Sequence, residues 1–200
     1  MKLFEKSYLL TLIFFIGIVF SSCETENENE LKLEGIYIVN EGQFGNNNGS
    51  ISLLDPESNA IQNNYFQKQN GRFPGDIVQD LSFRGDKGFI VVNNSKKVEI
   101  VDKNTFETID VIGNISYPRQ FLPVSDQKGY LTNGTSADGS NGHVYVIDLQ
   151  HYSITDTIEV GKGPESMVML DNNVFVTNAG GYSVGNTVSV INSNTDEVIE

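Results

Sequence analysis

The chain has 200 residues, a formal net charge of -13 at pH 7, no tryptophan and a single cysteine. This length can hold one domain with a sizeable core. The negative charge argues against nucleic acid as a partner, because phosphate binding requires clustered lysine and arginine. The single cysteine excludes an internal disulfide framework and a multi-cysteine zinc site, and nothing in the sequence calls for a metal or a cofactor.

Residues 1–22 have the pattern of a signal peptide. Lys2 and Lys6 precede an apolar run from Leu9 to Phe20, which is too short to span a bilayer but suits a signal-peptide core. Small residues directly before Cys23 are typical of lipoprotein signals, in which this cysteine becomes the acylated N-terminus. Lipid on the cysteine would anchor the chain without a transmembrane helix. An ordinary secretory signal with an incidental cysteine is the alternative.

Residues 23–34 are interpreted as an acidic tether behind the lipid anchor. The segment Glu24 to Glu30 reads ETENENE and contains no apolar residue. It therefore cannot pack against a core, and we expect a flexible linker.

Residues 35–200 divide into four repeats of short strands rich in β-branched and aromatic residues. The first comprises Gly35 to Asn40, Ile51 to Leu54 and Asn64 to Gln67. The second comprises Ile77 to Phe83, Phe89 to Asn93, Val98 to Val101 and Thr108 to Ile112. The third comprises Phe121 to Val124, Gly129 to Asn133, Val144 to Ile147 and Thr155 to Val160. The fourth comprises Met167 to Leu170, Val174 to Asn178, Val188 to Ile191 and Val198 to Ile199.

Three sets of residues recur at matching positions in these repeats. They are the prolines Pro74, Pro118 and Pro164, the strand-closing asparagines Asn40, Asn93, Asn133 and Asn178, and the strand ends Asp55, Asp102, Asp148 and Asn192. A period of about 45 residues with four strands is the spacing of a propeller blade. The sequence therefore predicts an all-β propeller of four-stranded antiparallel blades, and a β-sandwich is the less favoured alternative.

The two end repeats are expected to be incomplete. The first lacks an inner strand, and the fourth stops at Glu200 inside its outermost strand. A propeller closes when one terminus completes the blade begun by the other, which removes exposed edges. We therefore expect part of a seven-bladed propeller, with a closed four-bladed ring as the alternative.

The strand-closing segments resemble a known repeat. Tyr37-Ile38-Val39-Asn40 and Phe175-Val176-Thr177-Asn178 look like the YVTN-type β-propeller repeat. With its N-terminus, the chain is similar to the YncE-like surface lipoproteins of Gram-negative gut anaerobes. Some of those proteins bind cobalamin beside an outer-membrane transporter, and acidic residues after their lipid cysteine mark display on the cell exterior. The resemblance implies the fold and makes a corrinoid one candidate ligand.

A propeller would bring several loops to one rim. The prolines would mark where each inner strand starts, and the next strand returns to the same end, so the closing asparagines lie there too. Loops on a rigid scaffold are where binding residues usually lie. The candidate ligand-binding residues are Asn40, Gln43, Phe44, Arg72, Asp76, Tyr117, Arg119, Gln120, Asn133, Glu165, Asn178 and Tyr182. Each asparagine also has a plainer interpretation, as a strand-end residue that bonds its own turn.

Catalytic groups are scarce. His143 and His151 flank one predicted strand, which places them at opposite ends, and we expect both at the surface. Cys23 is assigned to lipid, and no serine has a plausible histidine base near the rim. We therefore expect no catalytic residue and no enzyme, although a pair of rim carboxylates is an arrangement that the sequence leaves open.

Two functions fit this pattern. In the first, the protein is lipid-anchored at the outer membrane, faces the cell exterior, and binds a small-molecule nutrient for an outer-membrane transporter. In the second, the propeller is a protein-interaction or adhesive scaffold of the cell envelope. In both, the membrane is contacted through the lipid alone.

The anchor can be tested directly. We predict that Cys23→Ser abolishes lipid modification, because the thiol that accepts the lipid is removed. Metabolic labelling with a fatty acid is the measurement, and Ser22→Ala, which keeps the cysteine, is the control that should stay labelled. Label retained on the Cys23→Ser protein would contradict the lipoprotein interpretation.

Overall fold

The structure is a computed structural model and describes residues 35–134, 140 and 142–200. The predicted signal peptide, Cys23 and the acidic tether lie outside the described residues. Within the described residues, no helix is long and apolar enough to cross a membrane.

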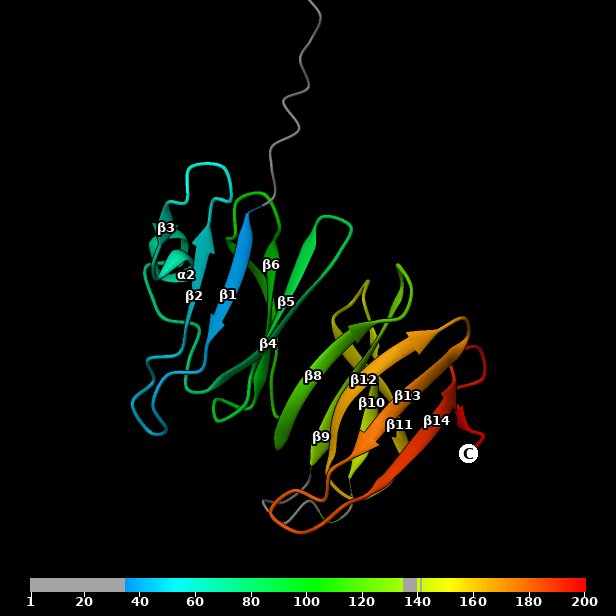
Figure 1. Cartoon of the computed structure of the whole chain (residues 1–200). Helices are drawn as coiled ribbons and strands as arrows, with labels where there is room; N and C mark the ends of the chain where they lie inside the picture. The colour runs from blue at the N-terminus through cyan, green and yellow to red at the C-terminus, as the bar shows by residue number, and fades with distance from the viewer. Residues whose placement is uncertain (1–34, 135–139, 141) are drawn as a thin grey trace, which may run out of the picture. The chain divides into compact units, whose positions relative to one another are not determined.

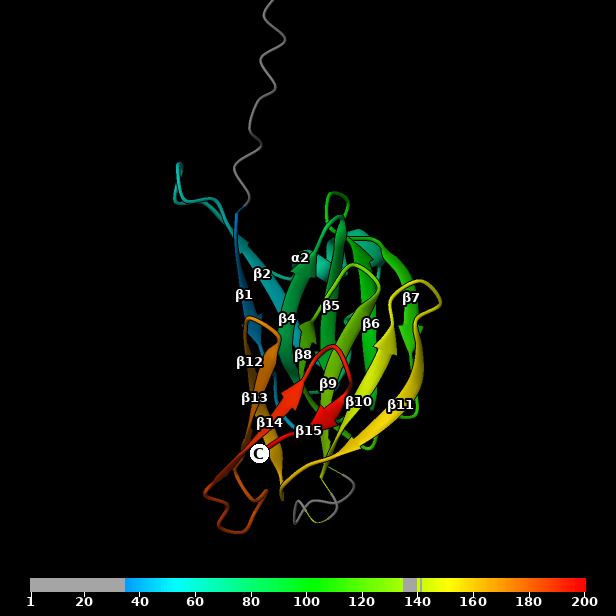
Figure 2. The same ribbon diagram turned by 90° about the vertical axis from the view of Figure 1, so that its right-hand side faces the viewer.

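Four antiparallel sheets follow one another along the chain (Figure 1, Figure 2), and the strands of each sheet pair in chain order. Sheet 1 contains β1 (Ile36–Asn40), β2 (Ser50–Leu54) and β3 (Ile61–Gln62). Sheet 2 contains β4 (Val78–Arg84), β5 (Lys87–Val92), β6 (Lys97–Asp102) and β7 (Thr108–Ile112). Sheet 3 contains β8 (Tyr117–Pro123), β9 (Lys128–Gly134), β10 (His143–Asp148) and β11 (Ser153–Glu159). Sheet 4 contains β12 (Pro164–Leu170), β13 (Asn173–Asn178), β14 (Thr187–Asn192) and β15 (Glu197–Val198).

Most of the predicted strands are therefore confirmed, with ends shifted by a few residues. The strand predicted from Asn64 to Gln67 is wrong, because these residues lead into the short helix α2 (Tyr65–Asn70). The helix places Phe66 in the core, where its side chain is fully buried. Gly71 ends the helix in the left-handed conformation and donates its N–H to the carbonyl of Gln67, as is common at helix C-termini.

Alternation of side chains along the strands gives the two middle sheets two buried faces. Phe89 and Val91 of β5 belong to the core between sheets 2 and 3, whereas Ile90 and Val92 belong to the core between sheets 1 and 2. Successive residues of a strand point to opposite faces, so a continuous apolar run is what a sheet covered on both sides requires. A third core lies between sheets 3 and 4 and includes Tyr130.

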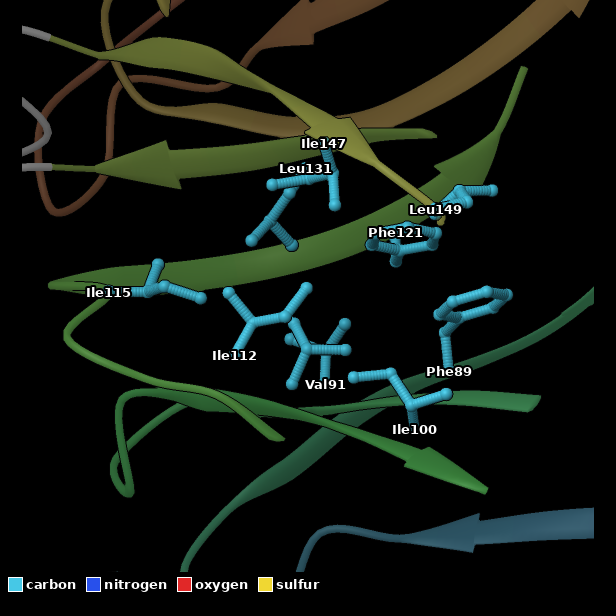
Figure 3. Close-up of a cluster of buried hydrophobic side chains, with 10 residues drawn as sticks. Phe89, Val91, Ile100, Ile112, Ile115, Phe121, Leu131, Ile147 and Leu149 are labelled. Carbon is cyan, nitrogen blue, oxygen red and sulfur yellow. The ribbon is translucent and has the colours of Figure 1, made fainter. Parts of the chain in front are cut away.

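Two stacked aromatic rings lie in the core between sheets 2 and 3 (Figure 3). The rings of Phe89 and Phe121 have centroids 4.5 Å apart and are nearly parallel, at 13°. Gly129 makes room for this pair, because a Cβ at that position would lie 2.4 Å from the ring of Phe121. A buried stack of this kind contributes roughly 0.5–1.5 kcal/mol beyond the area that it buries.

Neighbouring inner strands are joined by a hydrogen bond that repeats from sheet to sheet. Strands β4, β8 and β12 each contain an irregularity near their start. Asp80 in β4 accepts the backbone N–H of Phe121 at 2.9 Å, and Gln120 in β8 accepts the backbone N–H of Met167 in β12. Burial raises the pKa of Asp80, and the N–H groups of Phe121 and Leu81 oppose this rise. These side chains bond N–H groups that the irregular strands would otherwise leave unpaired.

The alignment of Pro74 with Pro118 and Pro164 is wrong by three residues. Pro118 lies opposite Asn133, and Pro164 lies opposite Asn178. The residue that meets Asn93 in the same way is Ile77, whose carbonyl accepts the Asn93 N–H at 2.8 Å. The inner strand of sheet 2 therefore starts later in the chain than the proline spacing suggests.

The repeated inter-sheet bond gives a stability prediction. Gln120→Leu should lower the free energy of unfolding by about 1–3 kcal/mol, because the buried N–H of Met167 loses its acceptor. Urea denaturation is the measurement. Gln150→Leu is the matched control, since the side chain of Gln150 is exposed in a turn. An unfolding midpoint unchanged in Gln120→Leu would show that the bond contributes nothing.

Candidate functional site

A pocket of about 520 Å³ lies at the ends of the sheets where the inner strands begin. Residues from the starts of β4, β8 and β12 line it, together with the last residue of β9 and residues from the loops that follow β1, β5 and β13. The loops after β1 and β13 project from the same end of the sheets (Figure 1). The predicted convergence of these strand starts and loops is therefore present.

Five of the predicted binding residues line the pocket: Phe44, Tyr117, Arg119, Glu165 and Tyr182. The other lining residues were not predicted, and those among them that are neither glycine nor proline are Glu41, Ile77, Gln79, Asn93 and Asn94. Glu41 and Asn94 directly follow the strand-closing asparagines Asn40 and Asn93, so the spacing of the repeats could have predicted both at the pocket. Ile77 and Gln79, at the start of the inner strand of sheet 2, were missed because the proline alignment placed this start too early in the chain.

Three aromatic side chains from different sheets meet at the pocket. Phe44 lies in the loop after β1, Tyr117 begins β8, and Tyr182 lies in the loop after β13. They are 75%, 37% and 89% exposed. Within the described residues, none of these three rings stacks on another aromatic ring. The exposed parts of these three side chains therefore contribute to the lining of the pocket.

An ion pair between two inner strands crosses one side of the pocket. Arg119 of β8 donates its Nε–H to both carboxylate oxygens of Glu165 of β12, at 2.9 Å each, and its Nη2 also bonds this carboxylate. Both side chains are partly exposed, so the pair contributes only about 0–1 kcal/mol to stability. Its main effect is to fix the orientation of the guanidinium and to neutralise Glu165 within the pocket.

Amide side chains provide most of the remaining polar lining. Gln79 donates its Nε2–H to Glu41 at 2.6 Å, and Asn93 donates its Nδ2–H to the carbonyl of Pro118 at 2.8 Å. Asn94 donates its Nδ2–H to Asp76 at 2.5 Å. All three amides therefore use an N–H on the protein itself.

Asp76 lies behind the pocket and orders the loop that carries Phe44. Its Oδ2 accepts the backbone N–H of Gly45 at 2.8 Å, and its own N–H donates to Ser95. The side chain is buried and does not line the pocket. Gln43 also stays out of the pocket lining, and its backbone N–H donates to Asn48 within the same loop.

Asn40, Asn133 and Asn178, which were predicted to bind a ligand, bond neighbouring strands and are not among the residues that line the pocket. Asn40 donates to Ser52, and Asn178 donates to Ser189 at 3.0 Å. Asn133 accepts the backbone N–H of Tyr117 at 2.8 Å. The plainer interpretation expected each asparagine to bond its own turn, but these bonds instead join the asparagines to the neighbouring strands β2, β8 and β14.

One histidine is buried, which corrects the expectation that both are at the surface. His143 is 6% exposed, and its Nε2 lies 3.0 Å from the amide nitrogen of Asn133. His151 is exposed and its ring lies 2.7 Å from Asp148. The two do not form a shared site, and the described residues contain no group of three or more His, Cys, Asp or Glu that could hold a metal ion.

Arg72 was predicted at the rim but lies against sheet 2 instead. Its guanidinium donates to both carboxylate oxygens of Glu99, at 2.8 and 2.9 Å, and Lys97 bonds the same carboxylate. Glu99 is fully buried. Burial alone raises the pKa of Glu99, but the bonds from Arg72 and Lys97 outweigh burial and hold this pKa below the ordinary carboxyl value.

Four sheets packed face to face, with inner strands that start at a common pocket, define a β-propeller. The chain belongs to the family described as Domain of unknown function (DUF5074), whose match covers residues 34–200. No curated protein matches it by sequence.

Solved β-propeller structures resemble the chain in fold. Hydrazine synthase of Kuenenia stuttgartiensis has a TM-score of 0.62 at 15% identity, over 76% of this chain and 42% of that one. BamB of Moraxella catarrhalis has a TM-score of 0.51 at 15% identity, over 75% and 42%. The dihydro-heme d1 dehydrogenase NirN, in complex with DHE, has a TM-score of 0.53 at 14% identity, over 75% and 32%. The chain thus spans less than half the length of each of these structures.

The Arg72 cluster gives a prediction with a defined pH dependence. Arg72→Met should lower the free energy of unfolding at pH 7 by about 2–3 kcal/mol, because buried Glu99 loses its bidentate partner. A carboxyl whose pKa is lowered in the folded state contributes stability above its unfolded pKa, and this is lost as pH falls toward the folded pKa. The difference from the original protein should therefore shrink below about pH 4.

Arg84→Met is the matched control for Arg72→Met. The two arginine side chains are equally exposed, at 44%, but Arg84 pairs with Asp126, which is 86% exposed. Loss of such a surface pair should cost less than about 1 kcal/mol. Urea denaturation between pH 3 and 7 compares the two variants. Equal effects at pH 7 would contradict the importance of the buried carboxylate.

Proposed function

We propose that this chain is a non-enzymatic binding propeller whose rim pocket holds a small molecule. The observation that carries the proposal is the meeting of Phe44, Tyr117 and Tyr182, from three sheets, at one pocket of about 520 Å³. Large aromatic side chains are normally buried, so their exposure around a common pocket favours a binding site. The volume falls in the range of about 300–1,000 Å³ that is usual for small-molecule sites.

The surroundings of these rings favour a preorganised site. The hydrogen bond from Gly45 to Asp76 holds the loop of Phe44, and the bond from the Tyr117 N–H to Asn133 holds the start of β8. Contacts that fix a site before the ligand arrives reduce the entropy that binding must overcome.

A non-enzymatic role agrees with the residue types at the pocket. The described residues that line it include no histidine, cysteine, serine or lysine. Its two carboxylates are Glu41, which accepts from Gln79, and Glu165, which is paired with Arg119. Neither arrangement provides a nucleophile with an adjacent general base.

We extend the proposal to the cellular location of the protein and to the identity of its ligand. The apolar signal core before Cys23 and the acidic segment after it support a lipid anchor in the outer membrane with display on the cell exterior. The resemblance of the repeats to YncE-like surface lipoproteins supports a nutrient ligand, with a corrinoid as the first candidate and an outer-membrane transporter as the partner.

A protein-interaction or adhesive scaffold is the second candidate function. Tyr182 and Val184 lie in the loop after β13 and are 89% and 94% exposed. Apolar side chains at a loop tip are also suited to a protein surface. In that case, the loop would contact a macromolecule and the pocket would bind no small ligand.

The proposal predicts separable effects on binding and stability. Tyr182→Ala and Tyr117→Ala should each weaken cobalamin binding about tenfold, because each removes an aromatic face worth roughly 1.4 kcal/mol. The melting temperature of Tyr182→Ala should stay unchanged, because this side chain is almost fully exposed. Calorimetric titration of the whole protein with cobalamin is the measurement.

Ile109→Ala is the control for these variants, since Ile109 is an exposed apolar residue of the outer strand β7. Its affinity should equal that of the original protein. Cobalamin binding that neither tyrosine variant weakens would place the site elsewhere, and no cobalamin binding would contradict the corrinoid assignment. Capture of an envelope protein that depends on Tyr182 and Val184 would favour the scaffold.

A further inference from the structure

The polar lining of the pocket includes three side-chain amides that are held by bonds to the protein. Gln79, Asn93 and Asn94 each direct an amide N–H to a protein oxygen. Within the described residues, the amide oxygens of these three side chains have no hydrogen-bond donor. The three residues line the pocket, which makes their amide oxygens candidate acceptors for a ligand that donates hydrogen bonds.

The orientation of these amides follows from their partners. Gln79 meets a carboxylate of Glu41, Asn94 meets a carboxylate of Asp76, and Asn93 meets a backbone carbonyl. Ionised carboxylates and carbonyls only accept hydrogen bonds, so each amide must present its nitrogen to the protein. The reversed orientations would bring two acceptors together, and the arrangement of acceptors at the pocket is thereby fixed.

The charge of the lining is also uneven. Arg119 and Glu165 neutralise each other, whereas Glu41 has only the neutral amide of Gln79 as a side-chain partner within the described residues. The charged residues among the described lining are these three, so the pocket has one carboxylate in excess. The formal charge of the whole chain, -13, has the same sign.

From these observations we infer that the pocket selects a protonated amine joined to an aromatic or apolar body, an inference that rests on the proposed binding function. The ammonium would donate to Glu41 and to the amide oxygens, and charge-assisted bonds of this kind are stronger than neutral ones. The rings of Tyr117 and Tyr182 would contact the apolar body and attract the cation through their faces. An anion would meet the excess carboxylate and three acceptor oxygens, and the cation of the described lining, Arg119, is already paired with Glu165.

Two probes with the same ring and opposite charge test the inference. Tryptamine carries a protonated amine, and indole-3-propionate carries a carboxylate. Calorimetric titration of the whole protein at pH 7 should show that tryptamine binds at least about tenfold more tightly. Glu41→Gln should reduce the affinity for tryptamine about tenfold and leave that for indole-3-propionate unchanged or improved, because the substituted amide still accepts from Gln79 but carries no charge.

Glu57→Gln is the matched control, because it makes the same charge change in the exposed turn after β2, at the end of sheet 1 away from the pocket. It should bind both probes as the original protein does. If both variants weaken tryptamine binding equally, the effect comes from the overall charge of the protein and the inference is overturned.

The remaining outcomes separate this inference from the proposed function. Equal or tighter binding of indole-3-propionate, lost in Tyr182→Ala, would overturn the selection of amines while supporting the rim pocket as a binding site. Absence of binding by either probe would overturn the amine inference. Cobalamin binding that is weakened in Tyr117→Ala and Tyr182→Ala would still support the pocket as a binding site. If neither the two probes nor cobalamin bind, both proposals are contradicted.

Discussion

The packing of each sheet on the next, through alternate side chains of the same strands, is the constraint on which the rest of the structure depends. Strand β5 sends Phe89 and Val91 to one neighbour and Ile90 to the other. A strand buried on both faces cannot slip by one residue without exchanging its two sets of contacts. This packing fixes where each inner strand starts, and the pocket is formed at those starts.

The inner strands keep their irregular starts because polar side chains compensate for them. Asp80 and Gln120 each accept an N–H from the next inner strand. The N–H groups of the irregular segments thereby form hydrogen bonds between sheets. The same irregular segment places Arg119 beside Glu165 at the pocket. The bonds between sheets and the geometry of the pocket therefore depend on the same segment of each inner strand.

The spacing of the repeats predicted the positions of residues in the fold correctly where the repeats have the same length. It gave wrong positions where a connecting segment differs in length. The recurring asparagines correctly marked the end of the sheets at which the pocket lies, although Asn133 and Asn178 are buried there and bond their neighbours. The proline register failed at Pro74, because the chain before β4 follows a helix and a turn that the other repeats lack. Arg72 and Asp76 were consequently placed at the rim, and Ile77 was missed.

Strand periodicity and turn residues along the chain were enough to predict the all-β class, the four repeats and the end of the sheets that carries the loops. Which side chains meet became clear only from the way the sheets pack. That packing pairs Arg72 with buried Glu99, buries His143, and brings Phe44, Tyr117 and Tyr182 to one pocket. Contacts between residues of different sheets join positions far apart in the chain, and local sequence spacing carries no direct record of them.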